Sequence, residues 1–392
     1  MLQAIDQKGD YIILALLPST EVQRYKQEKY FYCPMCKAPV IVKAGSKTIA
    51  HFAHHKKSLC PNSSGGEGEY HERGKLHLYQ WLKGQGLAVW LEWYISHIKQ
   101  RPDILLKVGK KVIAIEYQCA RITMNEFIQR NKGYHQMNIT PIWILGGNRM
   151  TRKSSSYLSM SSSDLLFLHQ FSSDLPLTIY YYCPDNLQFA CFHHIQTTGT
   201  KRTIGELVFR SLHDMNFNDL FRKYYFNKIN IYENWKKQMY ERRIKPVHYI
   251  GRKEKQWRQW LYVQKINANL IPSICHLPIA TQWRMMTAPW IWQSRLLISL
   301  FQDKKYVTLQ SCHHILSNHM HNKSLFPLIH GPNDPVSEYL TLLVKLHTLK
   351  QISDTRYYVS KQITFPKTVD MAIDEDNQLI KQMLSPSFLT HD

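Results

Sequence analysis

The stretch RPDILLKVGKKVIAIEYQ, residues 101–118, constrains the fold more than any other part of this chain. Two apolar runs flank Gly109, which predicts a β-hairpin that turns near this glycine. Asp103 begins the first strand, and Glu116 and Gln118 share one face of the second, because side chains alternate along a strand. Asp103 can meet this face across the pair. The stretch therefore predicts either a hairpin with polar ends or two strands that hold a metal ion at a phosphodiester.

Further helices and strands surround this hairpin in a definite order. HERGKLHLYQWLKGQG, which starts at His71, has apolar residues at helical spacing and predicts a helix that ends at Gly84 or Gly86. A strand is predicted over 88–95, a helix over 123–138 and a buried strand over 139–147. The order from residue 70 to residue 147 is therefore α-β-β-β-α-β, which indicates an α+β fold built around a sheet.

The chain divides into three predicted domains. Residues 1–62 predict short strands and a polar helix that lead into a group of Cys and His residues. PNSSGGEGE, residues 61–69, has the composition of a loop, and we expect the sheet domain over 63–155. Residues 156–392 begin with a serine-rich connection and a hairpin over 180–192, and beyond about residue 200 the pattern becomes mostly helical.

The charge of the chain indicates a polyanionic partner. The sequence has 392 residues and a formal net charge of +21. The excess of basic residues is concentrated in residues 1–155 and 201–260, whereas residues 156–200 contain neither Lys nor Arg. Such clustering is typical of a nucleic-acid-binding surface. Because hydrophobic residues make up 44% of the chain, we expect most of it to fold around well-buried cores.

Neither a membrane span nor a secreted protein is expected. The longest early apolar run, YIILALL at residues 11–17, is too short for a span and lacks the basic flank of a signal peptide, so it predicts a core strand. Of the eight Cys residues, only three are grouped. This distribution is typical of a cytoplasmic protein with a metal site and not of a disulfide scaffold.

The group near the N-terminus has the spacing of a zinc knuckle. FYCPMCKAPV and IAHFAHHKKSLC offer five ligands for four places, and the first four have the spacing C-x2-C-x14-H-x2-H; the five are Cys33, Cys36, His51, His54 and Cys60. We expect either His51 or Cys60 to be the spare ligand, with His55 as a weaker option. A shell filled by protein predicts a structural Zn²⁺ ion that stabilises a domain with little core. The alternative is a pair of buried thiols with surface histidines.

Carboxylates near the hairpin suggest a second kind of metal site. Mg²⁺ prefers oxygen ligands and can activate water at a phosphodiester. On the preceding helix, His71 and Lys75 lie on the same stripe as Leu78 and Leu82, so this stripe is apolar at one end and polar at the other. Four residues before His71 lies Glu67, whereas Glu69 lies off the stripe. The alternative is a solvated helix terminus whose acids are favoured by the dipole.

Taken together, these residues resemble the competence protein CoiA family. The resemblance covers the CP-x-C and HFAH segments, E-x-E-x-H-x-x-G-K at 67–75, LEWYI and QRPDILL within 91–106, AIEYQCARIT at 114–123, Arg130-x3-Tyr134, and IWILG at 142–146. It implies a restriction-endonuclease-like domain of the PD-(D/E)xK type after the zinc knuckle, with a mostly helical C-terminal domain. It also implies a role in natural transformation, in processing or recombining incoming single-stranded DNA.

The resemblance also assigns roles to individual residues. Asp103 resembles the PD aspartate and Glu116 the second metal carboxylate, while Gln118 stands where most PD-(D/E)xK enzymes carry Lys. Gln118 can orient water but brings no positive charge, which Lys75 on the helix stripe would supply instead. The remaining assignments are Glu67 or Glu69 as the first-helix acid, with His71 beside it, Glu92 as a further polar candidate, and Arg130 and Tyr134 as a DNA-positioning pair.

A basic and aromatic stretch follows in the C-terminal region. WKKQMYERRIKPVHYIGRKEKQWRQWLY, residues 235–262, alternates cations with aromatic rings, an arrangement typical of single-stranded nucleic-acid binding. The alternative is a pair of amphipathic helices whose Trp residues are core and whose cations are solvated. The candidate DNA-binding residues are Lys236, Lys237, Arg242, Arg243, Arg252, Lys253 and Trp257.

Two functions are compatible with this pattern. The first is a deoxyribonuclease dependent on Mg²⁺ or Mn²⁺ that acts on single-stranded DNA during competence. The second is a DNA-binding accessory protein with a nuclease fold and little or no cleavage, which assists a recombinase on transforming DNA. A regulator that binds duplex DNA by a helix-turn-helix has no clear motif in its favour.

Overall fold

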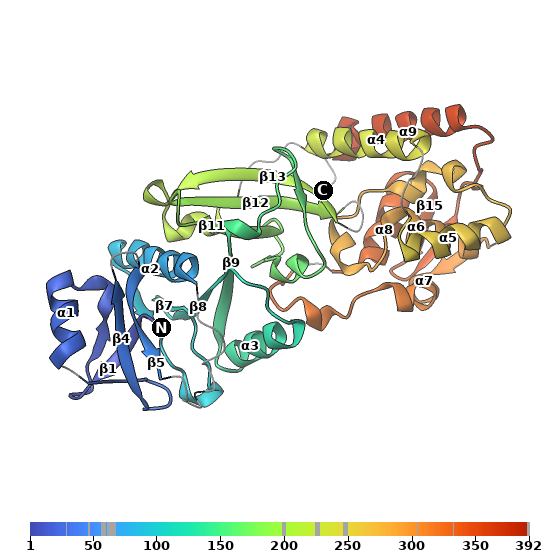
Figure 1. Cartoon of the computed structure of the whole chain (residues 1–392). Coiled ribbons are helices and arrows are strands. Elements are labelled where there is room, and N and C mark those ends of the chain that lie inside the picture. Colours follow the sequence, from blue (N-terminus) through green and yellow to red (C-terminus); the bar gives the residue numbers. More distant parts are fainter. Residues whose placement is uncertain are drawn as a thin grey trace. The chain divides into compact units, whose positions relative to one another are not determined.

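The structure, a computed structural model, describes residues 1–28, 30–45, 48–55, 60, 68–197, 201–223, 228–245, 250–302, 304–331 and 333–389. Two compact units are present, and each is considered by itself (Figure 1). Unit 1 comprises Met1–Met150, Thr178–Phe192 and Leu207–Arg222; unit 2 comprises Thr151–Leu177, His193–Glu206 and Lys223–Asp392. Among the described helices, none has both the length and the apolar character needed to cross a bilayer.

The first part of unit 1 is a small antiparallel sheet with the strand order β2-β1-β3-β4-β5. Its core is small and is centred on Tyr25, Phe31 and Phe52, whose rings pack on one another. A core of this size favours additional stabilisation by a metal ion. The elements are β1 (Gln3–Asp6), β2 (Tyr11–Ile13), α1 (Ser19–Glu28), β3 (Phe31–Tyr32), β4 (Pro39–Gly45) and β5 (Thr48–His54).

The second part of unit 1 is the sheet predicted around the hairpin. Strand β7 is antiparallel to its neighbours β6 and β8, and β8 runs parallel to β9, which is parallel to β11. The parallel β8–β9 pair is joined through α3, as a parallel connection requires. The elements are α2 (Glu69–Gly84), β6 (Ala88–Leu91), β7 (Ile104–Val108), β8 (Lys111–Gln118), α3 (Met124–Gln136), β9 (Ile139–Gly146) and β11 (Thr178–Cys183).

Local sequence explains where these elements begin and turn. The β7–β8 hairpin turns at Gly109, whose φ of +57° lies in the left-handed region that favours glycine. Helix α3 begins after Thr123, which forms a capping box with Glu126. The predicted order α-β-β-β-α-β is therefore confirmed, and the predicted α+β fold class with it. Helix α2 and strand β8 approach each other at Gly74, where the Tyr117 ring leaves no room for a Cβ atom.

Strands β12 (Gln188–Thr197) and β13 (Arg202–Ser211) each contribute residues to both units. The sequence predicted a hairpin over 180–192 but did not identify β13. Unit 2 is otherwise mostly helical, as predicted, and includes the antiparallel sheet β14-β16-β15. Its elements are β10 (Tyr157–Ser159), α4 (Lys228–Ile244), α5 (Arg252–Val263), α6 (Pro289–Leu296), β14 (Tyr306–Thr308), α7 (Leu309–Leu316), α8 (Pro335–Lys345), β15 (Leu349–Ser353), β16 (Arg356–Val359), α9 (Val369–Met383) and α10 (Pro386–Leu389).

Candidate functional site

A cluster of buried charges lies in unit 1 where α2 packs against the sheet. We define the acid–lysine cluster as Lys75 with Glu92, Asp103 and Glu116. Lys75 comes from the first half of α2, Glu92 follows β6, Asp103 precedes β7, and Glu116 lies within β8. In the register of the hairpin, Ile104 pairs with Ile115, which places Asp103 opposite Glu116. The hairpin therefore brings the two motif carboxylates to the same end of the sheet.

Lys75 lies at the centre of this cluster. Its side chain is 0% exposed, and its Nζ lies 2.5 Å from Glu92 Oε1 and 3.6 Å from Asp103 Oδ1. A buried ammonium is costly unless anionic partners compensate it, so these two carboxylates account for its position. The polar end of the helix stripe thus faces the motif aspartate.

Asp103 is held by groups from two elements besides Lys75. Its Oδ2 accepts a hydrogen bond of 2.9 Å from the backbone N–H of Tyr117, and His71 Nε2 lies 3.5 Å from the same oxygen. The His71 ring also stacks on the Tyr117 ring, with 5.5 Å between centroids. Both stripe residues, His71 and Lys75, therefore contact the aspartate.

Glu116 is bound on one oxygen by two residues of α3. Its Oε1 accepts hydrogen bonds from the Arg130 guanidinium, with Nε at 3.1 Å, and from the Tyr134 hydroxyl. Arg130 also donates to the carbonyl of Arg101 at 3.2 Å. Burial raises the pKa of Glu116, which Asp103 raises further and Arg130 opposes. Among the described residues, no hydrogen bond to Oε2 of Glu116 is recorded, so this oxygen remains available to a cation.

The structure places the predicted DNA-positioning pair, Arg130 and Tyr134, beside Glu116. The Tyr134 ring is fully buried, and both Arg130 and Tyr134 contact Glu116. A fully buried ring cannot contact DNA directly, so Tyr134 binds the Glu116 carboxylate instead, whereas a DNA contact by the partly exposed Arg130 stays a prediction. Gln118 also differs from its expected place, because its Nε2 donates to the carbonyl of Ala120 at 3.0 Å, at the end of its own strand.

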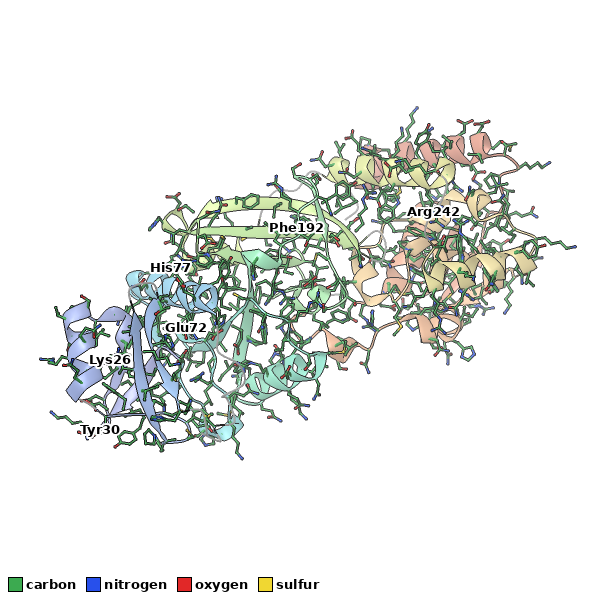
Figure 2. All side chains as sticks on the ribbon, in the orientation of Figure 1. Lys26, Tyr30, Glu72, His77, Phe192 and Arg242 are labelled. Atoms are coloured by element: carbon green, nitrogen blue, oxygen red, sulfur yellow. The ribbon has the colours of Figure 1, made fainter. Side chains whose placement is uncertain are left out.

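The three glutamates in and just before α2 differ in where they lie. Glu67 lies outside the described residues. Glu69 is half-exposed and lies 4.0 Å from Arg73, away from the cluster, so its assignment as the first-helix acid is corrected. Glu72, which sequence reasoning missed, is buried, and its carboxylate lies 3.0 Å from the α-ammonium of Met1 and 3.9 Å from His51 Nδ1 (Figure 2 labels Glu72). Its positions three residues before Lys75 and seven before Tyr79 place it on the buried side of α2, which is the signal that could have identified it.

The zinc-knuckle prediction is narrowed from five candidate residues to four. The possible ligand atoms of Cys33, Cys36, His54 and Cys60 all lie within 4.8 Å of one another. His51 is the spare, because its Nδ1 lies 2.9 Å from the carbonyl oxygen of Ile49. Burial and the nearby positive charge of Arg101 lower the pKa of His54, which favours the neutral imidazole that binds metals. Three sulfurs and one imidazole fit the tetrahedral preference of zinc.

The carboxylates can be tested against a Mg²⁺ ion in the same way. The four-residue Cys/His group is the one cluster of three or more protein ligands found within the described parts of the chain. A Mg²⁺ ion requires fewer, since it is commonly held by one or two carboxylates with waters and phosphate oxygens. Asp103 and Glu116 are oxygen donors on adjacent strands, and Oε2 of Glu116 is available, so their chemistry fits this ion.

The basic and aromatic stretch of unit 2 is partly structural. Trp257 is 0% exposed, and its Nε1 donates to Ser294 Oγ at 2.8 Å, so it cannot stack on a base. Arg243 is 2% exposed and donates to both oxygens of Asp376, at 3.0 and 2.9 Å. We therefore correct the assignment of both residues to DNA binding. Trp257 lies in the core, as the alternative of amphipathic helices describes, whereas Arg243 is a buried ion-pair partner that neither hypothesis describes.

Arg242 is also committed to contacts within unit 2. Its NH2 donates to Glu254 at 3.0 Å, and its guanidinium lies 3.9 Å from the centre of the Trp290 ring (Figure 2 labels Arg242). Burial lowers the pKa of Arg242 to about 10. The other candidate DNA-binding cations are at the surface: Lys236, Lys237, Arg252 and Lys253. The Nζ of Lys253 lies 2.7 Å from the carbonyl oxygen of Met286.

Comparisons with known proteins identify the family of the chain. Three family models match: the N-terminal domain of competence protein CoiA over residues 14–63, its nuclease-like domain over 67–225 and its C-terminal domain over 231–373. The chain is 29% identical over 360 residues to competence protein CoiA of Bacillus subtilis (strain 168), which covers 88% of this chain and 94% of that protein. No solved structure matches the chain.

Proposed function

Because the chain belongs to the competence protein CoiA family, we propose that it processes DNA during competence by hydrolysing phosphodiester bonds at the acid–lysine cluster. The observation that carries this proposal is the fully buried Lys75 held between Glu92 and Asp103. It supplies the positive charge that the motif lacks at Gln118. A nuclease-type site built from these residues is therefore complete in residue types, although its lysine comes from a helix and not from the strand.

Asp103 and Glu116 would hold a divalent ion, Mg²⁺ or Mn²⁺, which when bound supplies activation of water and neutralisation of charge on the phosphate. In the hydrolysis, the oxygen of water bonds to phosphorus while one P–O ester bond breaks, and the departing oxygen takes a proton. Lys75 offsets the negative charge that develops at phosphorus. Arg130 and Tyr134 fix the Glu116 carboxylate by binding one of its oxygens.

The knuckle residues Cys33, Cys36, His54 and Cys60 would hold a structural Zn²⁺ ion in the same unit. The expected substrate is single-stranded DNA in the cytoplasm, where a recombinase is an expected partner. Support for a polyanionic substrate comes from the net charge of +21 and from the exposed cations of α4 and α5.

The test is cleavage of labelled single- and double-stranded oligonucleotides with Mg²⁺ or Mn²⁺. Asp103→Asn, Glu116→Gln and Lys75→Met are each expected to lower the rate by about a hundredfold or more, since each removes a charge at the phosphate. Glu69→Gln is the matched control, because Glu69 lies on the same helix but faces away from the cluster. Equal rates in all four variants would refute the proposed site.

A second candidate function is DNA binding without cleavage, in assistance of a recombinase. It is favoured by Gln118, which is turned to Ala120, and by Glu116, which already pairs with Arg130. In the same assay, binding of DNA by every form with cleavage by none of them would favour this function over the first.

A further inference from the structure

Glu92 has an unusual backbone for its residue type. Its φ of +49° lies in the left-handed region, which non-glycine residues adopt rarely and at an energetic cost. Such a conformation persists where the surroundings fix it from several sides. Here its own N–H donates to the carbonyl of Asp103 at 2.9 Å, which ties the end of β6 to the start of β7. The strained residue is therefore anchored directly to the motif aspartate.

The Glu92 side chain is bound just as tightly. It is 2% exposed, with Oε1 at 2.5 Å from Lys75 Nζ and Oε2 at 3.7 Å from Arg101 NH1. Its Oε2 also accepts a hydrogen bond of 3.0 Å from the backbone N–H of Leu2. Both oxygens are thus engaged by donors, and the carboxylate is directed at Lys75 and away from solvent.

The hydrogen bond between Leu2 and Glu92 connects the acid–lysine cluster to the first residues of the chain, which in turn contact strand β5. Met1, next to Leu2, accepts a hydrogen bond from the N–H of Phe52 at 2.9 Å. Phe52 lies in β5, the strand that ends with the zinc-ligand candidate His54. A backbone hydrogen bond from β5 to Met1 and a hydrogen bond from Leu2 to the Glu92 carboxylate therefore connect the strand that carries His54 to the acid–lysine cluster.

We propose that Glu92 is a positioning residue that holds Lys75 against Asp103, and that the knuckle sustains this position through Leu2. The consequence for cleavage rests on the proposed function, but the positioning itself does not. Two carboxylates of the described residues, Glu92 and Asp103, lie within ion-pair distance of Lys75, and Arg101 and His71 lie beside those carboxylates in turn. Removing the charge of Glu92 takes away the nearer of these two carboxylates and keeps Asp103, at 3.6 Å, as an anionic neighbour of Lys75.

The first test follows the Lys75 side chain by NMR in the full-length protein labelled with ¹³Cε-lysine. The signal is assigned by its loss in Lys75→Arg, and its pH titration is compared among wild type, Glu92→Gln, Glu92→Asp and Glu69→Gln. Because an anionic neighbour favours the ammonium form, Glu92→Gln is expected to move the midpoint of the titration down by about one unit or more. Glu92→Asp is expected to recover part of the shift, and Glu69→Gln to leave the midpoint unchanged.

A purely structural role for Glu92 would lower the unfolding midpoint without moving the Lys75 titration. That result, with a titration in Glu92→Gln that matches wild type, would overturn the positioning role. Thermal unfolding of each variant is measured alongside the NMR experiment, so that a loss of folded structure is recognised. Should Glu92→Gln fail to fold, the comparison of Glu92→Asp with wild type decides, with an unchanged titration overturning the proposal.

The second test addresses the knuckle. Zinc is removed from the folded protein by chelation, or prevented from binding by Cys36→Ser, and the Lys75 signal is compared with the zinc-loaded form. We expect the Lys75 signal to shift or broaden, while the signal of the exposed Lys350 in unit 2 stays in place. An unchanged Lys75 signal in zinc-free protein would overturn the link to the knuckle.

Cleavage assays then separate this proposal from the proposed function. If the protein cuts DNA, Glu92→Gln is expected to lower kcat by about tenfold or more with little change in KM, since Lys75 is displaced and not the DNA-binding surface. If no form cuts DNA, the proposed function fails, while the NMR titration still decides on the positioning role of Glu92.

Discussion

At the residue scale, the site shows how one charge can be replaced from a different element. The family resemblance implies a lysine at the strand position of Gln118, and in the proposed site Lys75 of α2 brings an ammonium to Glu92 and Asp103 instead. Two residues that the motif does not include, Glu72 and Glu92, complete the buried charges. Each buried charge has a partner of opposite sign, as the low dielectric of the interior requires.

Glu116 allows a prediction about pH. Burial raises the pKa of its carboxyl above the usual 4.5. At a pH between 4.5 and this raised pKa, the folded protein therefore holds a proton that the unfolded chain has released. The contribution of this group to stability is therefore present below about pH 4.5 and is lost as pH rises through the folded pKa. Glu116→Gln cannot titrate, so the stability of wild type relative to this variant should fall as pH rises.

This comparison requires urea unfolding of both proteins from pH 4.5 to pH 8, with Glu69→Gln as a control for an exposed carboxylate. Stability curves of wild type and Glu116→Gln that run parallel over this range would contradict the prediction.

The buried pair of Arg243 and Asp376 gives a second prediction at this scale. Arg243→Met leaves the Asp376 carboxylate buried without its bidentate partner, and we expect a loss of about 3 to 5 kcal/mol in the unfolding free energy. Lys245→Met, an exposed change directly after the same helix, should cost far less. Chemical denaturation measures both variants, and equal losses would show that Arg243 is not a buried structural charge.

At the scale of elements, the approach of α2 to β8 decides where Lys75 lies. A Cβ atom at Gly74 would lie 2.1 Å from Cε1 of Tyr117, a ring that is 1% exposed and whose hydroxyl donates to the carbonyl of Tyr182 at 3.0 Å. The ring has little freedom to move away. Gly74 therefore allows α2 to pack closely enough on β8 for Lys75 to reach the carboxylates of the cluster.

Gly74→Ala is expected to push α2 from β8 and to destabilise the protein by about 1 to 3 kcal/mol. It should also impair any activity that depends on Lys75. Gly84→Ala on the same helix is the matched control, since nothing lies within 4 Å of its added Cβ atom. Chemical unfolding of both variants is the measurement, and a Gly74→Ala protein as stable as Gly84→Ala would disprove the close contact.

Helix α5 carries the part of the basic stretch that remains at the surface. Arg252, Lys255 and Gln259 are exposed at helical spacing, and Tyr262, one turn further, is 83% exposed. The acid of this helix, Glu254, is already bonded to Arg242 and to other groups of unit 2. If the protein binds single-stranded DNA, this face has both cations for phosphates and a ring for an unpaired base.

Tyr262→Ala is therefore expected to weaken binding of an oligothymidine by about 1 to 3 kcal/mol, and Lys255→Glu to reduce the dependence of affinity on salt. Fluorescence anisotropy in EDTA measures binding without cleavage. Tyr30→Ala is the control, because Tyr30 is 69% exposed but lies in unit 1. Unchanged affinity in Tyr262→Ala would exclude base stacking on α5.

At the scale of the whole molecule, the two units differ in how their cores are made. Unit 2 has one large apolar cluster with many fully buried side chains, whereas the sheet β1–β5 of unit 1 has a small cluster that includes Cys33 and Cys60. Zinc removal should therefore increase hydrogen exchange in β4 and β5 and leave α8 of unit 2 unaffected. Exchange measured by mass spectrometry with and without a chelator tests this, and protection of β5 unaffected by chelation would contradict it.

The sequence by itself determined the fold class, the order of elements from α2 to β9, the family and the types of residue at the site, because these depend on local periodicity, turns and motif spacing. Only the tertiary structure decided which candidates meet. It excluded His51 from the knuckle and Trp257 from the surface, and it placed Glu92 against Lys75. Partner choice among buried charges depends on how separate elements pack, which periodicity along one chain does not encode.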